Sequence, residues 1–126
     1  MHIGFHFEKI HKEEITHTQI VRYAGASGDF NPIHTVVPFG EKAGLGGVIV
    51  HGMMIMGFIG QAIDTWCASN DLVKFSTRFQ TITRPGESIT VSGLIVGETE
   101  HLWVCQAEAV NEHGEIKASA HFEVRK

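Results

Sequence analysis

The sequence VIVHGMMIMGFIGQAIDTWC, residues 48–67, decides how the rest of the chain can be arranged. Between Gly52 and Cys67, large apolar side chains fall on nearly every side of a helix, which is the pattern of a helix buried all round. The stretch also carries a histidine, a glutamine, an aspartate and several glycines, whereas a membrane span has about 20 predominantly apolar residues. We therefore expect a helix in the core of a globular domain and no membrane segment.

The sequence after this helix predicts four strands. Apolar and polar residues alternate over residues 74–83, 88–96, 102–110 and 116–125, and turn residues separate these stretches. The last strand has the clearest pattern, because one face is apolar and the other is polar or charged. Its inward face is expected to consist of Ile116, Ala118, Ala120, Phe122 and Val124. Its outward face begins with Lys117.

The sequence before the long helix predicts one strand and two shorter helices. Apolar residues at alternate positions from Ile3 to Phe7 indicate the strand. Thr16, followed three residues later by Gln19, has the spacing of a capping box, so a helix should begin there. Residues 27–29 should end it. A short helix is expected over residues 38–44, which a proline opens and a glycine closes.

These elements form one expected domain, residues 1–126, because no repeat, low-complexity segment or flexible linker divides the chain. One apolar helix and about five successive antiparallel strands predict an α+β fold in which an antiparallel sheet wraps around a central helix. Covering a helix on every side takes more sheet than this chain supplies. We therefore expect a homodimer in which a second copy covers the exposed sheet edges.

The composition indicates which kinds of partner and which cellular compartment to expect. Lys and Arg number 10 against 14 Asp and Glu, for a formal net charge of −4, so the basic surplus typical of nucleic-acid-binding proteins is missing. The first residues lack the basic start and apolar run of a secretory signal. Cys67 and Cys105 form no CxxC pair, which favours free thiols in a reducing compartment. We expect a cytoplasmic protein that binds neither nucleic acid nor a membrane.

The densest group of polar residues lies in SGDFNPIH, residues 27–34. Pro32 keeps Asn31 out of helical angles, so this stretch should be a kinked loop that turns Asp29 and His34 toward one point. An aspartate, with an ordinary pKa of about 3.9, beside a histidine, at about 6.5, provides groups for both sides of a proton transfer near neutral pH. The spacing alone also fits an aspartate that caps a turn and a histidine on the surface.

The run YAGASGDFNPIH, residues 23–34, resembles the hydratase-2 motif of the MaoC-like dehydratases. Residues 48–53, VIVHGM, resemble the second signature of that family, at the start of its long central helix. The order of the expected elements is similar over essentially the whole chain. The resemblance implies a single hot dog fold and the activity of an (R)-specific enoyl-CoA hydratase or 3-hydroxyacyl thioester dehydratase.

The resemblance also implies roles for individual residues. Asp29 and His34 match the catalytic acid/base pair of the family. Gly52 matches the glycine whose backbone amide faces the thioester oxygen. The positions that hold the loop in shape are matched by Ser27, Gly28 and Asn31.

The residue types suit this chemistry. Hydration of a trans-2-enoyl thioester takes a proton from water, which attacks C3, and delivers a proton to C2, and two adjacent acid/base groups that hold one water can do both. Negative charge gathers on the thioester oxygen, where an N–H at a helix N-terminus stabilises it. The expected substrate is a small acyl thioester of CoA or of acyl carrier protein, with neither a metal nor a redox cofactor.

The remaining histidines are expected to have structural or surface positions. His51 lies beside the Gly52 amide, and we expect it to shape the entrance of the helix through a hydrogen bond. Surface positions are expected for His2, His6, His11, His17, His101, His113 and His121. A zinc site would need three or four clustered ligands, so no metal site is predicted.

Two other functions stay open on the residues alone. A hot dog thioesterase needs a carboxylate near the thioester carbonyl carbon, but it does not need a histidine paired with it on the same loop. A non-catalytic acyl-binding hot dog has no use for both side chains. The presence of both Asp29 and His34 favours the hydratase.

Overall fold

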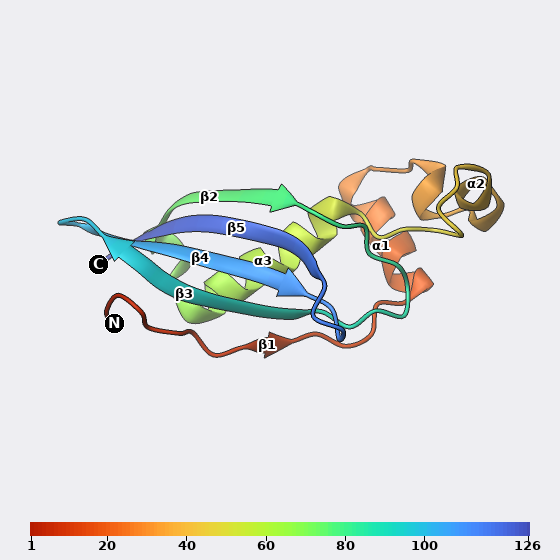
Figure 1. Ribbon diagram of the computed structural model, residues 1–126. Coiled ribbons are helices and arrows are strands. Elements are labelled where there is room, and N and C mark those ends of the chain that lie inside the picture. Colours follow the sequence, from red (N-terminus) through yellow and green to blue (C-terminus); the bar gives the residue numbers. More distant parts are fainter.

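Five antiparallel strands form one sheet, and the long helix α3 (Gly52–Trp66) lies along one face of it (Figure 1). The computed structural model describes residues 1–126. In the order in which they lie side by side, the strands are β1 (Ile10–His11), β3 (Thr90–Glu98), β4 (Leu102–Val110), β5 (Ile116–Arg125) and β2 (Leu72–Phe79). The predicted α+β fold, an antiparallel sheet around a central helix, is confirmed.

Two shorter helices, α1 (His17–Ser27) and α2 (Val37–Lys42), lie beyond one end of the sheet (Figure 1). The start of α1 is the predicted one, since the Thr16 hydroxyl accepts a hydrogen bond from the Gln19 backbone N–H at 3.1 Å. Its end is also as predicted, with Gly28 in the left-handed region at φ 77°. Two 3₁₀ turns complete the chain, η1 (Pro32–His34) and η2 (Ser69–Asp71).

Helix α3 is buried on one side only, so the prediction of a helix buried all round is wrong for the single chain. The side against the sheet is formed by Met54, Ile55, Phe58, Ile59, Ala62 and Ile63. On the opposite side, Met53, Gly57, Gln61 and Asp64 are exposed. The sheet curls around the helix without enclosing it, and hydrophobic periodicity alone does not tell which apolar side chains it covers.

Small side chains on the central strands let α3 approach the sheet closely. In β4 and β5 the positions facing the helix include four buried alanines, Ala107, Ala109, Ala118 and Ala120. Phe122, on the same face of β5, is fully buried and fills the space further along the helix. The inward face predicted for the last strand is therefore correct from Ala118 to Val124.

The N-terminal segment follows β3 without forming the regular strand predicted from Ile3 to Phe7. Phe7 N–H donates to the Gly93 carbonyl at 2.9 Å, but only Ile10–His11 forms a ladder. A turn begins the segment, with Gly4 at φ 89° and the Phe5 N–H bonded to the His2 carbonyl, so that His6 forms only an isolated bridge with Leu94. Further along, the Trp66 indole N–H donates to the Glu8 carbonyl at 2.7 Å and its ring stacks on Phe7 at 4.9 Å. The segment is thus held partly by a side chain of α3.

The strand predicted over residues 74–83 ends early, at Phe79. Beyond it the chain turns toward the start of α3, and the Thr83 carbonyl accepts a hydrogen bond from the Val50 N–H at 2.8 Å. Residues 80–83 therefore leave the sheet but form one wall of the region in front of α3.

Lys117 lies in the interior rather than at the exposed surface that the alternation predicts. Its side chain is 2% exposed. Its ammonium group donates to the Ile82 carbonyl at 2.8 Å, pairs with Glu87 at 2.8 Å and also contacts Glu115. Burial alone would lower the pKa of Lys117, but the hydrogen bonds to Glu115 and Glu87 outweigh it and raise that pKa. The side chains of β5 still alternate between its two faces, but residues 82–87 cover the outer face at Lys117.

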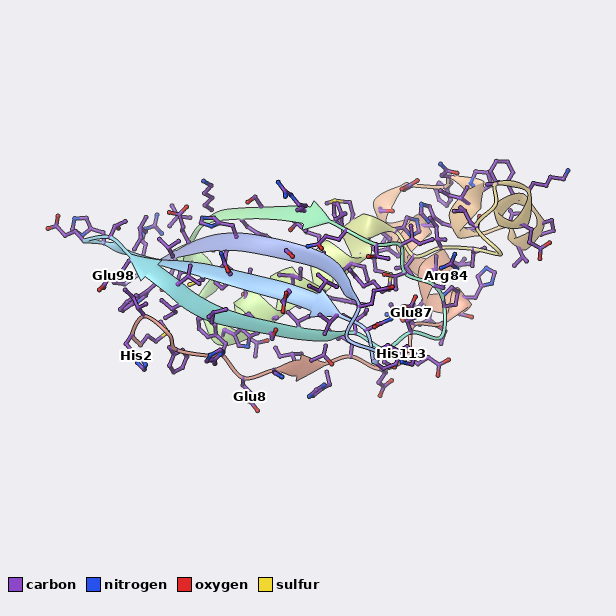
Figure 2. All side chains as sticks on the ribbon, viewed as in Figure 1. His2, Glu8, Arg84, Glu87, Glu98 and His113 are labelled. Atoms are coloured by element: carbon purple, nitrogen blue, oxygen red, sulfur yellow. The ribbon has the colours of Figure 1, made fainter.

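Glu87 is the less exposed of the two acidic partners of this lysine and lies near the end of the sheet where β4 turns into β5 (Figure 2). It also accepts a hydrogen bond from the Asn111 amide at 2.7 Å. Burial would raise the pKa of Glu87, but hydrogen bonds from Lys117, the Arg84 backbone and Asn111 lower it below its ordinary value of 4.5.

Replacing Glu87 with glutamine should lower the free energy of unfolding by about 1.5–3 kcal/mol at neutral pH, the usual worth of a hydrogen bond to a charged group. Because the folded-state pKa of Glu87 is lowered, the stability that the carboxylate adds is present above pH 4.5 and is lost as the pH falls through the folded value. The difference from wild type should therefore shrink in acid. Urea unfolding at neutral and acid pH measures both effects.

The matched control is Glu100→Gln, which removes the same charge from an exposed turn where only His101 is near. It should change stability by less than about 0.5 kcal/mol, as surface substitutions usually do. Equal stability of Glu87→Gln and wild type at neutral pH would contradict a stabilising role for the buried pair.

Candidate active site

The loop after α1 presents Asp29 to solvent in a defined conformation. Gly28 ends the helix, and the Asp29 N–H donates to the Ser27 hydroxyl at 3.2 Å. The Asp29 carboxylate accepts the Asn31 N–H on Oδ1 at 3.3 Å, which leaves Oδ2 for other contacts. The side chain is 52% exposed. These short-range hydrogen bonds fix the loop without burying the carboxylate.

His34 is held much more tightly, at the end of η1. Pro32 opens this turn and the Asn31 side chain caps it by accepting the Ile33 N–H at 3.2 Å. The buried His34 ring is 2.8 Å from the Ile49 carbonyl through Nδ1. A carbonyl can only accept, so Nδ1 carries the hydrogen and Nε2 keeps its lone pair in the neutral ring. Nε2 faces Asp29 Oδ2 at 3.8 Å.

His51 lies against both members of this pair. Its ring stacks on His34, with 3.8 Å between centroids and 19° between planes, and its Nε2 is 3.1 Å from the Asp29 carbonyl. The edge of Tyr23 meets the same ring at 4.8 Å. The predicted hydrogen bond of His51 is therefore present, and it fixes the Asp29 loop rather than the helix itself.

Gly52 is the first residue of α3 and its N–H makes no hydrogen bond within the protein. The first N–H groups of a helix carry partial positive charge. A Cβ at this position would lie 3.3 Å from the ring of Phe79, a tight contact that this half-exposed side chain can relieve by moving. Since it has no partner within the protein, the Gly52 N–H is available to a ligand oxygen.

A pocket of about 230 Å³ brings His34 and Gly52 together. Its walls are made mainly of two segments, residues 49–55 and residues 79–83. Ile55, Phe79 and Ile82 give it apolar surface, and Lys117 lines it from β5. Its walls combine apolar side chains with a few polar groups, the combination that orients small ligands in proteins.

The sequence thus predicts three residues that the structure brings to one place, Asp29, His34 and Gly52. It does not point to the partners that orient them. Ile49 acts through its backbone carbonyl, which every residue possesses. Phe79 belongs to β2, which is distant in the sequence from the loop that carries Asp29 and His34. Lys117 follows the pattern of an exposed strand residue, so no local signal could have indicated its place beside the pocket.

The polar atoms of Asp29, His34 and His51 lie within 4.8 Å of one another, which raises the question of a metal. Lone pairs on ring nitrogens lie in the ring plane, and a bound zinc would lie about 2.0–2.1 Å from each nitrogen. Because the two rings are stacked nearly parallel, their lone pairs do not converge on one point. The geometry suits hydrogen bonding and proton transfer better than metal binding.

The sheet wrapped around one helix is the hot dog fold, and solved structures of that fold match nearly the whole chain. The R-hydratase of Pseudomonas aeruginosa in its unliganded form has a TM-score of 0.88 over 98% of this chain and 81% of that chain, with 19% identity. The (R)-hydratase from A. caviae involved in PHA biosynthesis has a TM-score of 0.85 over 98% and 96%, with 16% identity. At these identities the likeness is one of fold.

The family follows from the sequence match. Residues 2–115 match the family described as MaoC like domain, and the chain belongs to the MaoC-like dehydratases. The 3-hydroxyacyl-thioester dehydratase X of Mycobacterium tuberculosis is 35% identical over 89 residues, 71% of this chain and 30% of that protein. The peroxisomal enoyl-CoA hydratase 2 of Arabidopsis thaliana is 29% identical over 102 residues, 79% of this chain and 32% of that protein.

The fatty acid synthase beta subunit of Gibberella zeae is 49% identical over 53 residues, which are 41% of this chain and 3% of that protein. The chain therefore corresponds to a small part of each of these curated relatives, at most 32% of their length. None of the helices combines the length and the apolar character that crossing a bilayer requires.

Proposed function

We propose that this protein catalyses the reversible hydration of trans-2-enoyl thioesters to (R)-3-hydroxyacyl thioesters. Asp29 and His34 are the acid/base pair, Gly52 holds the thioester oxygen, and neither a metal nor a redox cofactor takes part. One observation carries this proposal: His34 Nε2 and Asp29 Oδ2 face each other at 3.8 Å. The Gly52 N–H, which makes no hydrogen bond within the protein, lies beside them. Membership of the MaoC-like family, with hydratases and dehydratases among its members, supports the same reaction.

The separation within the pair suits a shared water. At 3.8 Å the two groups are too far apart for a direct hydrogen bond, whereas a water oxygen can lie about 2.8 Å from both. One group takes a proton from this water as its oxygen bonds to C3, and the pair then delivers that same proton to C2. Both groups end in their starting states, and the double bond has gained the H and OH of one water. Both additions occur on one face of the double bond.

The second requirement is a group that stabilises the negative charge that develops on the thioester oxygen in either direction of the reaction. The Gly52 N–H at the start of the 15-residue helix α3 can donate to that oxygen, and the helix dipole adds to the effect. His34 and Gly52 line the same pocket, so a thioester held by Gly52 lies beside the pair.

The proposed reaction is tested by incubating the protein with crotonyl-CoA and longer enoyl-CoA substrates while following enoyl absorbance and free thiol. We expect absorbance to fall without thiol release, and chiral analysis to give the (R)-3-hydroxyacyl product. Release of thiol would identify a thioesterase instead, and no change in either signal would leave an acyl-binding module. A predominantly (S) product would contradict the proposed mechanism.

Replacing Gly52 with proline should lower turnover about 10²–10³-fold, the usual cost of losing one oxyanion donor. Proline is tolerated at the first position of a helix, and His51 already has the extended backbone that precedes proline, at φ −61° and ψ 132°. The variant should therefore fold, which circular dichroism and thermal melting check. The control is Gly52→Ala, which keeps the N–H and should retain most activity because the half-exposed Phe79 ring can move. Wild-type turnover in the folded proline variant would place the thioester oxygen elsewhere.

Asp29→Asn and His34→Gln should each lower turnover about 10²–10⁴-fold, the usual worth of a positioned acid or base. If both groups act on one water, the double variant should be little worse than the worse single variant, because residues that act together are not additive. Turnover of the four proteins, with melting curves alongside, measures this. Multiplicative losses would contradict the shared water, and near-wild-type activity of either folded single variant would contradict the pair. His113→Gln, at an exposed turn, is the control.

We also propose a homodimer. Strand β2 is at an edge of the sheet and pairs only with β5, and its Val73 and Phe79 are exposed, as is Met53 of the neighbouring helix α3. A second copy could cover the edge and these apolar side chains. Light scattering at micromolar concentration should give twice the mass of 13.9 kDa. A clean monomer mass would contradict the proposal.

The two cysteines support a reducing compartment, and we propose the cytoplasm. Cys67 and Cys105 are both free thiols. Burial raises the pKa of Cys105 to about 12, with a smaller effect from Cys67, so Cys105 stays a neutral thiol and packs as a small apolar side chain.

A further inference from the structure

His51 is the one side chain that lies against all three parts of the candidate site. It is 2% exposed, it immediately precedes Gly52, its Nε2 contacts the Asp29 carbonyl at 3.1 Å and its ring stacks on His34 at 3.8 Å. It does not line the pocket. Because its side chain is buried behind Asp29 and His34, we expect its effect on the reaction to pass through these neighbours.

The contacts of His51 define which of its ring nitrogens carries the hydrogen. Because the Asp29 carbonyl can only accept, the hydrogen is on Nε2. The other nitrogen, Nδ1, is buried and has no hydrogen-bond partner. His51 thus carries its ring hydrogen on Nε2, the opposite tautomer to His34, whose hydrogen is on Nδ1.

We propose that His51 is a positioning residue that sets the geometry of the Asp29–His34 pair. Its Nε2–H holds the main chain of Asp29, whose own side chain is half exposed and otherwise restrained only by the loop. Its ring face fixes the plane of His34, so that Nε2 of His34 points at the carboxylate. The inference rests on the proposed function for the reaction that it affects.

Two amide substitutions separate the contributions of His51. His51→Gln places an amide N–H near the position of Nε2 and can still donate to the Asp29 carbonyl, whereas the shorter His51→Asn places its amide near Nδ1. His51→Asn should lower kcat about 10–10²-fold, because a misplacement of about 1 Å can cost 10²-fold. KM should not change, since His51 is not part of the pocket wall. His51→Gln should recover most of the lost kcat.

The control is His11, whose ring Nδ1 is 2.8 Å from the Thr90 hydroxyl. This contact joins β1 to β3, and neither strand contributes a residue to the pocket. His11→Asn and His11→Gln should both keep the kcat of wild type. Wild-type kcat in folded His51→Asn, a change in KM alone, or a His51→Gln variant no more active than His51→Asn would each overturn the proposal.

Nitrogen NMR of the wild-type protein tests the inference without any substrate. The ¹⁵N shifts should report His51 as the Nε2–H tautomer and His34 as the Nδ1–H tautomer at neutral pH. In His51→Asn the His34 ring and Asp29 amide resonances should move, and in His51→Gln the Asp29 amide should keep its wild-type shift. An Nδ1–H tautomer of His51, or unmoved His34 and Asp29 resonances in His51→Asn, would overturn the positioning role. A wild-type protein that leaves every enoyl thioester unchanged, with the expected tautomers, would instead refute only the proposed function.

Discussion

The buried segment from Val48 to Val50 holds the site together, because its backbone groups bind two other parts of the chain. Ile49 donates its N–H to the Ile33 carbonyl at 3.0 Å, and its carbonyl accepts from the His34 ring at 2.8 Å. Val50 N–H donates to the Thr83 carbonyl at 2.8 Å. The same segment then enters α3 directly. One short extended stretch thus sets the position of the η1 turn relative to the helix start and the pocket wall.

This arrangement links the candidate site to the interior of the sheet. Lys117, held by Glu87, donates to the Ile82 carbonyl, and the adjacent Thr83 carries the Val50 hydrogen bond. A buried ion pair contributes little net stability compared with apolar packing, but breaking it leaves a charge without its partner. Its effect here is to fix residues 80–83 after they leave β2. The Gln80 N–H, on the Lys117 carbonyl at 2.9 Å, and the Thr81 hydroxyl, on the Ile116 carbonyl at 3.0 Å, hold the same segment against β5.

Much of the fold could be predicted because periodicity and caps are local. Residues 102–110 form the predicted strand, and α1 begins after Thr16 and ends before Gly28 as expected. The failures at α3 and at Lys117 depend on contacts between distant segments. Periodicity marks α3 as apolar without saying which side the sheet covers, and alternation places Lys117 outward without indicating that residues 82–87 lie over it. Asp29 and His34 share a short loop, so their proximity was predictable. The carbonyl that orients His34 was not, since every residue has one.

His34 is held more firmly than Asp29, so the geometry of the site depends mainly on how Asp29 is restrained. His34 is buried, hydrogen-bonded to Ile49 and stacked on His51, so the direction of its free nitrogen is fixed from two sides. Asp29 is half exposed, and its carboxylate is bound only by the Asn31 N–H of its own loop. The distance of 3.8 Å between His34 Nε2 and Asp29 Oδ2 therefore depends on how firmly the main chain of Asp29 is held. Of the contacts that restrain that main chain, the one from His51 comes from outside the loop. A rigid imidazole and an exposed carboxylate become a defined pair because one buried histidine contacts both.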